Sequence, residues 1–258
     1  MRQLRYTTRS GIGVTRTLSR IPYRRGLRSL LRELDRRRGI YLSSGYEYPE
    51  RYSRWDVAAL NPPLEIVARG REVEFRALNE RGAALARMLG AVLAPHPHWE
   101  RLEARPGALH GTLKPLPALF PEEERSKQPS VFSILRALVE EFRHAKDSRL
   151  VLAGAFGNHL MLQVDPIRLK QPRGEQRGPH LFVCDDNHLM DRKREVIERY
   201  QYEFSFEDYS TMGLARETED VPSQAAPPDA APGITADHEP GEYMAKVETV
   251  RRGGKAGG

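Results

Sequence analysis

Hydrophobic residues recur every three or four positions in three parts of the chain, and this spacing predicts three amphipathic helices. The predicted helices span residues 21–38, 80–93 and 131–142. The apolar stripe of the first one consists of Leu27, Leu30, Leu31 and Leu34. Its arginines fall on the opposite side and are predicted to face solvent, and Gly39 is predicted to end the helix as a C-cap. Residues 121–127 are predicted to be a charged helix start that precedes the third helix.

Alternating apolar and polar residues, or short apolar runs between turn residues, predict seven strands. They span residues 40–44, 64–69, 72–78, 150–155, 159–164, 180–184 and 196–206. Gly70 and Arg71 alone separate the second strand from the third, which favours a hairpin, and short connections imply antiparallel order. We therefore expect an α+β fold, with a mostly antiparallel β-sheet and a few amphipathic helices packed on it.

The composition is that of a soluble globular protein, since 39% of the residues are hydrophobic and 29% are charged. No apolar run approaches the roughly 18 residues of a membrane span. The basic N-terminus is not followed by the apolar segment of a secretory signal. The single cysteine, Cys184, fits a reducing compartment and is predicted to fill space in a strand. We expect a cytoplasmic protein that does not associate with membranes.

The net charge of +6 raises the question of a nucleic-acid partner. The basic residues concentrate in residues 16–38 and 251–255, whereas the middle of the chain mixes both signs. No nucleic-acid-binding motif accompanies them, and the aromatic residues between positions 41 and 55 lack the spacing of a stacking platform. We therefore expect no nucleic-acid partner.

Residue types that commonly catalyse reactions or bind metals are present, but their spacing matches no known site. None of the eight histidines forms an HxxxH or HExxH pair. Residues 185–188 and Asp191 could be combined into a metal cluster, but a polar turn after a strand is the simpler interpretation. The glutamates at positions 122–124 are interpreted as charges favoured in the first turn of a helix. The sequence also has no GxGxxG, Walker or nucleophile-elbow motif, so we expect no catalytic site and no metal site.

The most distinctive stretches of the sequence are six segments spread over nearly the whole chain. They are RRGIYLSSGYEYPERYSRWD (residues 37–56), NPPLEIVARGR (61–71), ALNERG (77–82), FPEEERSKQPSVFSILRAL (120–138), GAFG (154–157) and DHEPGEYMAKVETVR (237–251). In this order they resemble the N-terminal third of the anthranilate synthase large subunit, component I, and are most similar to the fused alphaproteobacterial type. Six collinear matches are more specific than any single short motif.

This resemblance implies a role in the first step of tryptophan biosynthesis, in which chorismate and glutamine or ammonia give anthranilate and pyruvate. It places the catalytic residues and magnesium in a chorismate-binding catalytic domain beyond the DHEPGEY segment, so this chain alone is expected to be inactive. The other implied partner is a glutamine amidotransferase domain or subunit. The expected organisation is a tryptophan-regulatory domain at residues 1–217, a Pro/Ala-rich linker at 218–240, and the start of the catalytic region with an aberrant tail at 241–258.

The resemblance also implies a feedback site for tryptophan. Relatives carry a short Leu-Leu-Glu-Ser strand, to which Tyr41, Leu42, Ser43 and Ser44 correspond. Ser44 is the matching serine, whose hydroxyl can bind the amino or carboxyl group of tryptophan. Ser43 replaces the glutamate, Arg54 matches a basic residue, and Leu42 can pack against the indole ring. From the residues alone, a simple strand end and a surface loop are the favoured explanation of these side chains, and only the resemblance favours a binding site.

Two alternatives remain open at this point. The first is an aminodeoxychorismate synthase, which shares this domain, although the GYEYPERYSRW stretch favours anthranilate synthase. The second is a non-catalytic remnant that acts as a binding or assembly module, because Asn158, His159 and Cys184 depart from the family pattern. If the chain does regulate an enzyme, tryptophan would act by binding one arrangement of the two domains more tightly than the other.

Overall fold

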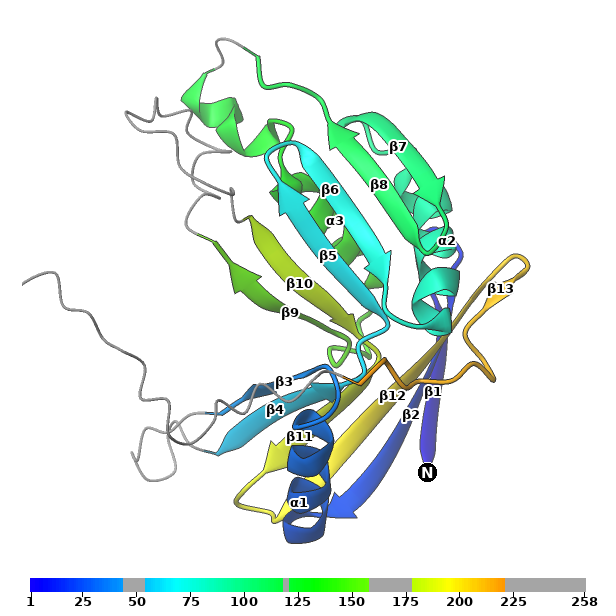
Figure 1. Ribbon diagram of the computed structural model, residues 1–258, viewed down its shortest axis with the longest axis vertical. Helices are drawn as coiled ribbons and strands as arrows, with labels where there is room; N and C mark the ends of the chain where they lie inside the picture. The colour runs from blue at the N-terminus through cyan, green and yellow to red at the C-terminus, as the bar shows by residue number, and fades with distance from the viewer. Residues whose placement is uncertain (44–53, 118–120, 158–177, 221–258) are drawn as a thin grey trace, which may run out of the picture. The chain divides into compact units, whose positions relative to one another are not determined.

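The computed structural model describes residues 1–43, 54–117, 121–157 and 178–220 (Figure 1). These residues lie within one compact unit, Met1–Pro222. In the described part of the chain there are three α-helices, one short 3₁₀ helix and two antiparallel sheets. The α+β fold with mostly antiparallel strands, expected from the sequence, is confirmed.

The first sheet has seven strands in the order β1–β2–β12–β11–β4–β3, with β13 paired to β12. The strands are β1 Arg2–Thr7, β2 Gly13–Pro22, β3 Gly39–Leu42, β4 Trp55–Leu60, β11 Asp186–Asp191, β12 Val196–Phe206 and β13 Tyr209–Ser210. Strand β12 matches the long strand predicted from alternation, and it pairs with β2 from Val196 opposite Pro22 to Ser205 opposite Gly13. The beginning and the end of the unit therefore share the centre of one sheet.

The second sheet has six strands in the order β7–β8–β6–β5–β10–β9. They are β5 Leu64–Arg69, β6 Glu72–Ala77, β7 Trp99–Arg105, β8 Ala108–Leu113, β9 Val151–Phe156 and β10 Pro179–Cys184. The predicted hairpin is confirmed, and its turn uses Gly70 at φ 57°, a left-handed conformation that glycine adopts without strain. Cys184 is buried at the end of β10, as predicted. The strand predicted at residues 159–164 lies outside the described residues.

Helices α2, Glu80–Leu93, and α3, Val131–Phe142, match two of the predicted helices, and η1, Glu122–Lys127, precedes α3. Asn79 caps α2, because its side chain accepts a hydrogen bond from the Gly82 amide at 2.9 Å. Both helices cover one face of the second sheet (Figure 1). Their apolar sides, that face and one face of the first sheet form the main core. We call this face of the first sheet its core face.

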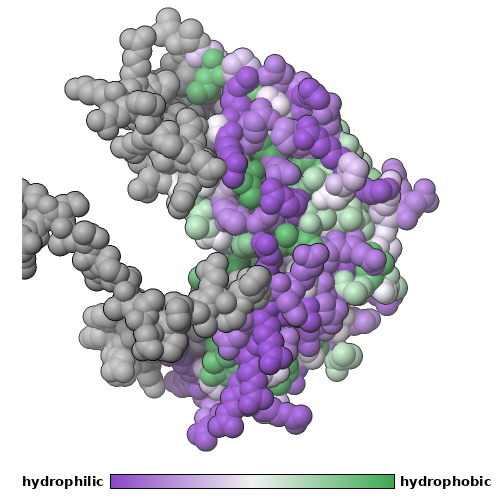
Figure 2. All heavy atoms as spheres, in the orientation of Figure 1, coloured by the Kyte–Doolittle hydropathy of each residue, from purple (hydrophilic) through white to green (hydrophobic). Residues whose placement is uncertain are grey.

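Helix α1, Tyr23–Leu34, packs on the other face of the first sheet, which we call the α1 face. A smaller apolar cluster lies between them, formed by Leu30, Ala58, Leu60, Met190 and Ile197. The outer side of α1 carries exposed arginines, as predicted, and Figure 2 shows hydrophilic residues over the lower part of the view, where α1 lies in Figure 1. The first sheet therefore lies between two apolar layers.

The first predicted helix is shorter than residues 21–38, and its predicted C-cap is wrong. Ile21 and Pro22 belong to β2, because their backbone pairs with β12, and the C-cap is Asp35. Gly39 instead begins β3, where an added Cβ would lie 2.6 Å from the backbone oxygen of Ala59. Glycine is therefore needed for close strand pairing at this position and not for the helix end.

The polar turn predicted at residues 185–188 is also wrong, because Asp186–Asp191 form strand β11 between β4 and β12. Strands β1, β2, β4, β7 and β8 were not predicted either.

None of the helices in the described ranges is both long enough and apolar enough to cross a membrane.

Candidate functional site

Among the residues singled out from the sequence, Tyr41 and Leu42 end β3, a strand at one edge of the first sheet, and Arg54 directly precedes β4. Leu42 is opposite Val57 of β4, and Tyr41 is opposite Ala58. Residues opposite each other in an antiparallel pair point to the same face, and neighbours along a strand alternate. Since Ala58 packs under α1, Tyr41 is on the α1 face and Leu42 is on the core face.

On the core face, an apolar surface lies beside an ion pair. The side chains of Leu42 and Trp55 are exposed by 56% and 44%. The Arg54 guanidinium lies 4.5 Å from the centre of the Trp55 ring, and its Nη2 donates to Asp191 Oδ2 at 3.0 Å. A ligand with an aromatic ring and a carboxylate would find an apolar contact and a cation here.

Asp191 fixes the position of Arg54. Its side chain is 3% exposed, and its Oδ1 accepts hydrogen bonds from the backbone amides of Lys193 at 3.0 Å and Arg194 at 3.1 Å. The hydrogen bond from Arg54, together with these amides, lowers the pKa of Asp191 below its usual value. The carboxylate is therefore ionised at neutral pH and holds Arg54 beside Trp55.

Ser43 belongs to a different group on the α1 face. Its Oγ accepts a hydrogen bond from Arg192 Nη2 at 2.8 Å. The same guanidinium donates to both carboxylate oxygens of the fully buried Asp56, at 2.7 and 2.8 Å. These hydrogen bonds raise the pKa of Arg192, and the Tyr23 hydroxyl lies 3.5 Å from Asp56. Ser43 is thus held by a charged cluster at the start of α1.

The structure therefore separates the residues that the sequence grouped. Leu42 and Arg54 lie near the core face, Ser43 binds Arg192 on the α1 face, and Ser44 lies outside the described residues. The pairing of Asp191 with Arg54 and of Arg192 with Ser43 could not be predicted from the sequence, because the partners are more than 130 residues apart. No local pattern indicates that β11 pairs with β4.

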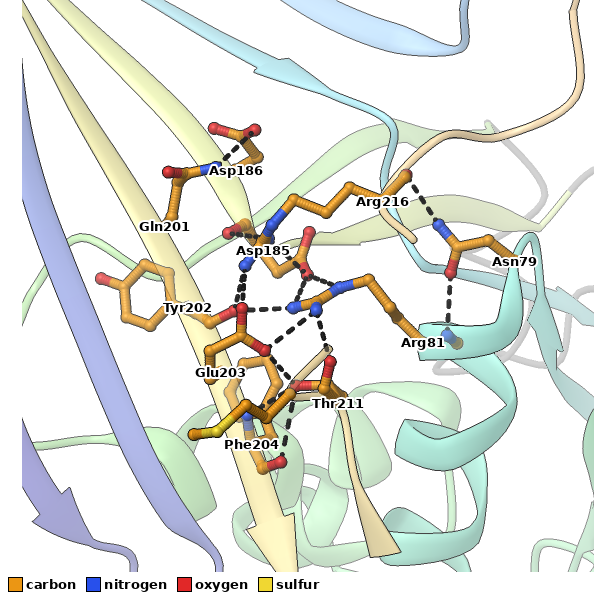
Figure 3. Close-up of polar contacts among 12 residues, drawn as sticks. Asn79, Arg81, Asp185, Asp186, Gln201, Tyr202, Glu203, Phe204, Thr211 and Arg216 are labelled. Atoms are coloured by element: carbon orange, nitrogen blue, oxygen red, sulfur yellow. Dashed lines mark hydrogen bonds and ion pairs between the residues drawn. The ribbon is translucent and has the colours of Figure 1, made fainter. Parts of the chain in front are cut away.

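A second polar cluster lies between the two sheets at the start of α2 (Figure 3). The guanidinium of Arg81 is 1% exposed and donates to Asp185 at 2.8 Å and to Glu203 at 2.9 Å. It also donates to the backbone oxygens of Thr211 and Tyr202, both at 2.7 Å. Every donor group of Arg81 is used within the protein, so Arg81 itself has no donor left for a ligand.

The same cluster fixes the last described segment of the chain, Thr211 to Asp220. Arg216 donates to Asp185 at 3.0 Å and to Glu203 at 2.5 Å, and its backbone oxygen accepts from Asn79 at 3.0 Å (Figure 3). Further along, the Thr218 hydroxyl donates to the Asn61 side chain at 3.1 Å. The segment is therefore anchored to β12 of the first sheet, to the start of α2 and to the loop between β4 and β5.

Residues 185–188 and Asp191, considered as a metal cluster from the sequence, are distributed over two faces. Asp186 pairs with Arg199 at 2.6 and 2.8 Å on the α1 face, whereas Asp191 pairs with Arg54 near the core face. Among the residues that the structure describes, no three His, Cys, Asp or Glu side chains are arranged to hold a metal ion.

Comparison with known proteins agrees with the resemblance drawn from the six sequence segments. No family model matches the chain. Anthranilate synthase of Azospirillum brasilense is 37% identical to it over 249 residues, which is 96% of this chain. The chain spans about a third of the length of that relative, 34%. The similarity to an anthranilate synthase, predicted from the sequence, is therefore confirmed.

Proposed function

We propose that this chain, which is similar to an anthranilate synthase over nearly its whole length, is the tryptophan-responsive regulatory part of such an enzyme. The observation that carries this proposal is the 37% identity over 96% of the chain. The complete enzyme would form anthranilate and pyruvate from chorismate and an amino group. In the proposal, the chorismate-binding domain, its magnesium ion and the glutamine amidotransferase correspond to the part of the relative that this chain does not span.

We place the tryptophan site at the core face beside the end of β3. Leu42 and Trp55 offer the indole ring exposed apolar surface, and Arg54 offers the tryptophan carboxylate a fixed guanidinium. The Ser44 hydroxyl completes the polar contacts in this proposal. The ion pair with Asp191 keeps Arg54 in position, so little side-chain entropy is lost when the ligand binds. Ser43 would act indirectly, through Arg192 on the opposite face.

Leu42 and Trp55 are exposed, and in this proposal the catalytic domain would cover the bound ligand. Tryptophan would then shift the enzyme toward the domain arrangement that closes the pocket, because it makes more contacts in that arrangement. The isolated chain is expected to bind tryptophan weakly, since it supplies half of the contacts. Tight binding to the isolated chain, measured by calorimetry, would contradict the two-sided pocket.

The function is tested by joining this chain to the remaining two thirds of the Azospirillum enzyme and following anthranilate fluorescence. The chain alone, given chorismate, magnesium and ammonia, is expected to make no anthranilate. The joined protein should be active and inhibited by tryptophan. Ser44→Ala and Leu42→Ala should remove most of the inhibition without changing the uninhibited rate.

Leu31→Ala is the matched control, because Leu31 is a similarly exposed leucine, 41%, on α1. Inhibition should be unchanged in this variant. If Leu42→Ala and Ser44→Ala are inhibited like the parent, the site is not at β3. If the isolated chain makes anthranilate, the regulatory assignment is wrong.

A further inference from the structure

A second candidate binding site is a cavity of about 420 Å³ between α1 and the α1 face of the first sheet. This volume lies within the range of small-molecule pockets in proteins. One wall is a row of α1 side chains one turn apart, Arg25, Ser29 and Glu33, and Glu217 also lines the cavity. The cavity is not lined by Leu42, Ser43 or Arg54, so within the described residues it is separate from the proposed tryptophan site.

Two of the cations in this cavity are already neutralised by protein groups. Arg199 pairs with Asp186 through two hydrogen bonds of 2.6 and 2.8 Å. Arg37 pairs with Asp220 at 3.2 Å and donates to the backbone oxygen of Thr218 at 2.5 Å. The charges of both guanidinium groups are therefore already balanced within the protein.

Three other charged groups in the cavity are not neutralised in this way. Arg25, Glu33 and Glu217 form no ion pair with any described residue. Arg25 and Glu33 are eight residues apart on α1, so they are separated by about 12 Å along the helix axis. Along α1, the wall of the cavity therefore presents a cation, Arg25, and a carboxylate, Glu33, at separate positions.

The wall between these charges is partly apolar and contains a buried polar atom without a partner. Leu30, Leu60 and Ile197 contribute aliphatic surface to the cavity. His188 also lines it and is 5% exposed, and its Nδ1 has no hydrogen-bond partner among the described residues. Burial lowers the pKa of His188 to about 4, so the ring is neutral at physiological pH. A neutral imidazole can donate or accept one further hydrogen bond without adding charge.

We propose that this cavity binds a small, extended zwitterion, with its carboxylate at Arg25, its ammonium group at Glu33, and an aliphatic middle along Leu30. An ω-amino acid has this chemistry. A ligand with a single charge would leave one end of the cavity unmatched, and a compact α-amino acid would not reach both ends. The proposal is independent of the tryptophan site and of the enzyme assignment.

The test is a titration of the full ¹⁵N-labelled chain with 6-aminohexanoate, followed by amide chemical shifts. Saturable shifts are expected in α1 and β11. Hexanoate, which lacks the ammonium group, and hexylamine, which lacks the carboxylate, should each bind about tenfold more weakly, since each loses one charge-assisted interaction. The variants Arg25→Gln and Glu33→Gln should weaken 6-aminohexanoate binding by a similar factor.

Arg28→Gln is the matched control, because Arg28 is an exposed arginine of the same helix that does not line the cavity. It should leave the affinity unchanged. Four results would overturn the proposal: no saturable shift, equal binding of the singly charged compounds, equal loss in Arg28→Gln, or displacement of 6-aminohexanoate by tryptophan. The last result would assign the cavity to the effector instead.

Discussion

Acidification should destabilise the folded chain through His188. Burial lowers the pKa of this histidine from 6.5 to about 4 in the folded state; the nearby Arg199 also lowers it, and Asp186 opposes the change. The unfolded chain therefore binds a proton at a pH where the folded chain does not. The stability associated with the neutral ring is fully present above pH 6.5 and is lost as the pH falls toward 4.

The size of the effect follows from the two pKa values. Each pKa unit corresponds to about 1.4 kcal/mol, so the complete loss is about 3 kcal/mol. Between about pH 7.5 and about pH 5, the expected loss from His188 is about 2 kcal/mol. This is a substantial fraction of the roughly 5–15 kcal/mol that stabilises a typical domain.

Urea denaturation of the full chain at these two pH values provides the measurement, with His188→Gln as the comparison. Glutamine is polar and does not titrate, so the variant lacks this part of the pH dependence. The parent should lose about 2 kcal/mol more than the variant between the two conditions. Equal losses in both proteins would show that His188 is not buried in its neutral form.

Two further predictions concern other buried groups. Arg81→Leu should destabilise the chain by about 3 kcal/mol in urea denaturation, because it leaves the buried Asp185 with fewer partners. Arg87→Leu, an exposed change on the same helix, should cost less than about 1 kcal/mol, and equal effects would refute the structural role of Arg81. Burial raises the pKa of Cys184 to about 12, so the folded chain should not react with a thiol reagent at neutral pH, whereas the chain in urea should. Rapid reaction under native conditions would contradict the buried position.

Those parts of the fold whose pattern is local could be predicted from the sequence. Helix α2 begins at Glu80 and ends at Leu93, as predicted, because its cap and apolar stripe are contained in one segment. Strand β12 was found from its alternation. Strand β11 was missed, since a polar run such as Asp186 to Asp191 is compatible with a strand only when distant arginines neutralise its carboxylates. That information is not contained in the run itself.

The candidate site was predicted less completely than the fold. Family resemblance pointed to four residues at positions 42–44 and 54, but strand alternation sends the side chains of Leu42 and Ser43 to opposite faces. The sequence also gave no indication that Arg54 is held by Asp191 or that Ser43 is held by Arg192. Both partners depend on the order of strands in the sheet, which only the three-dimensional structure reveals.

The pairing of β2 with β12 has a consequence for synthesis of the chain. Residues 13–22 leave the ribosome long before residues 196–205, to which they hydrogen-bond. During translation, β2 has its hairpin partner β1 on one side and an unpaired edge on the other. The second sheet can assemble earlier, because its strands come from residues 64–184. We expect nascent chains that end before β12 to depend on chaperones, because their first sheet is divided into two incomplete parts.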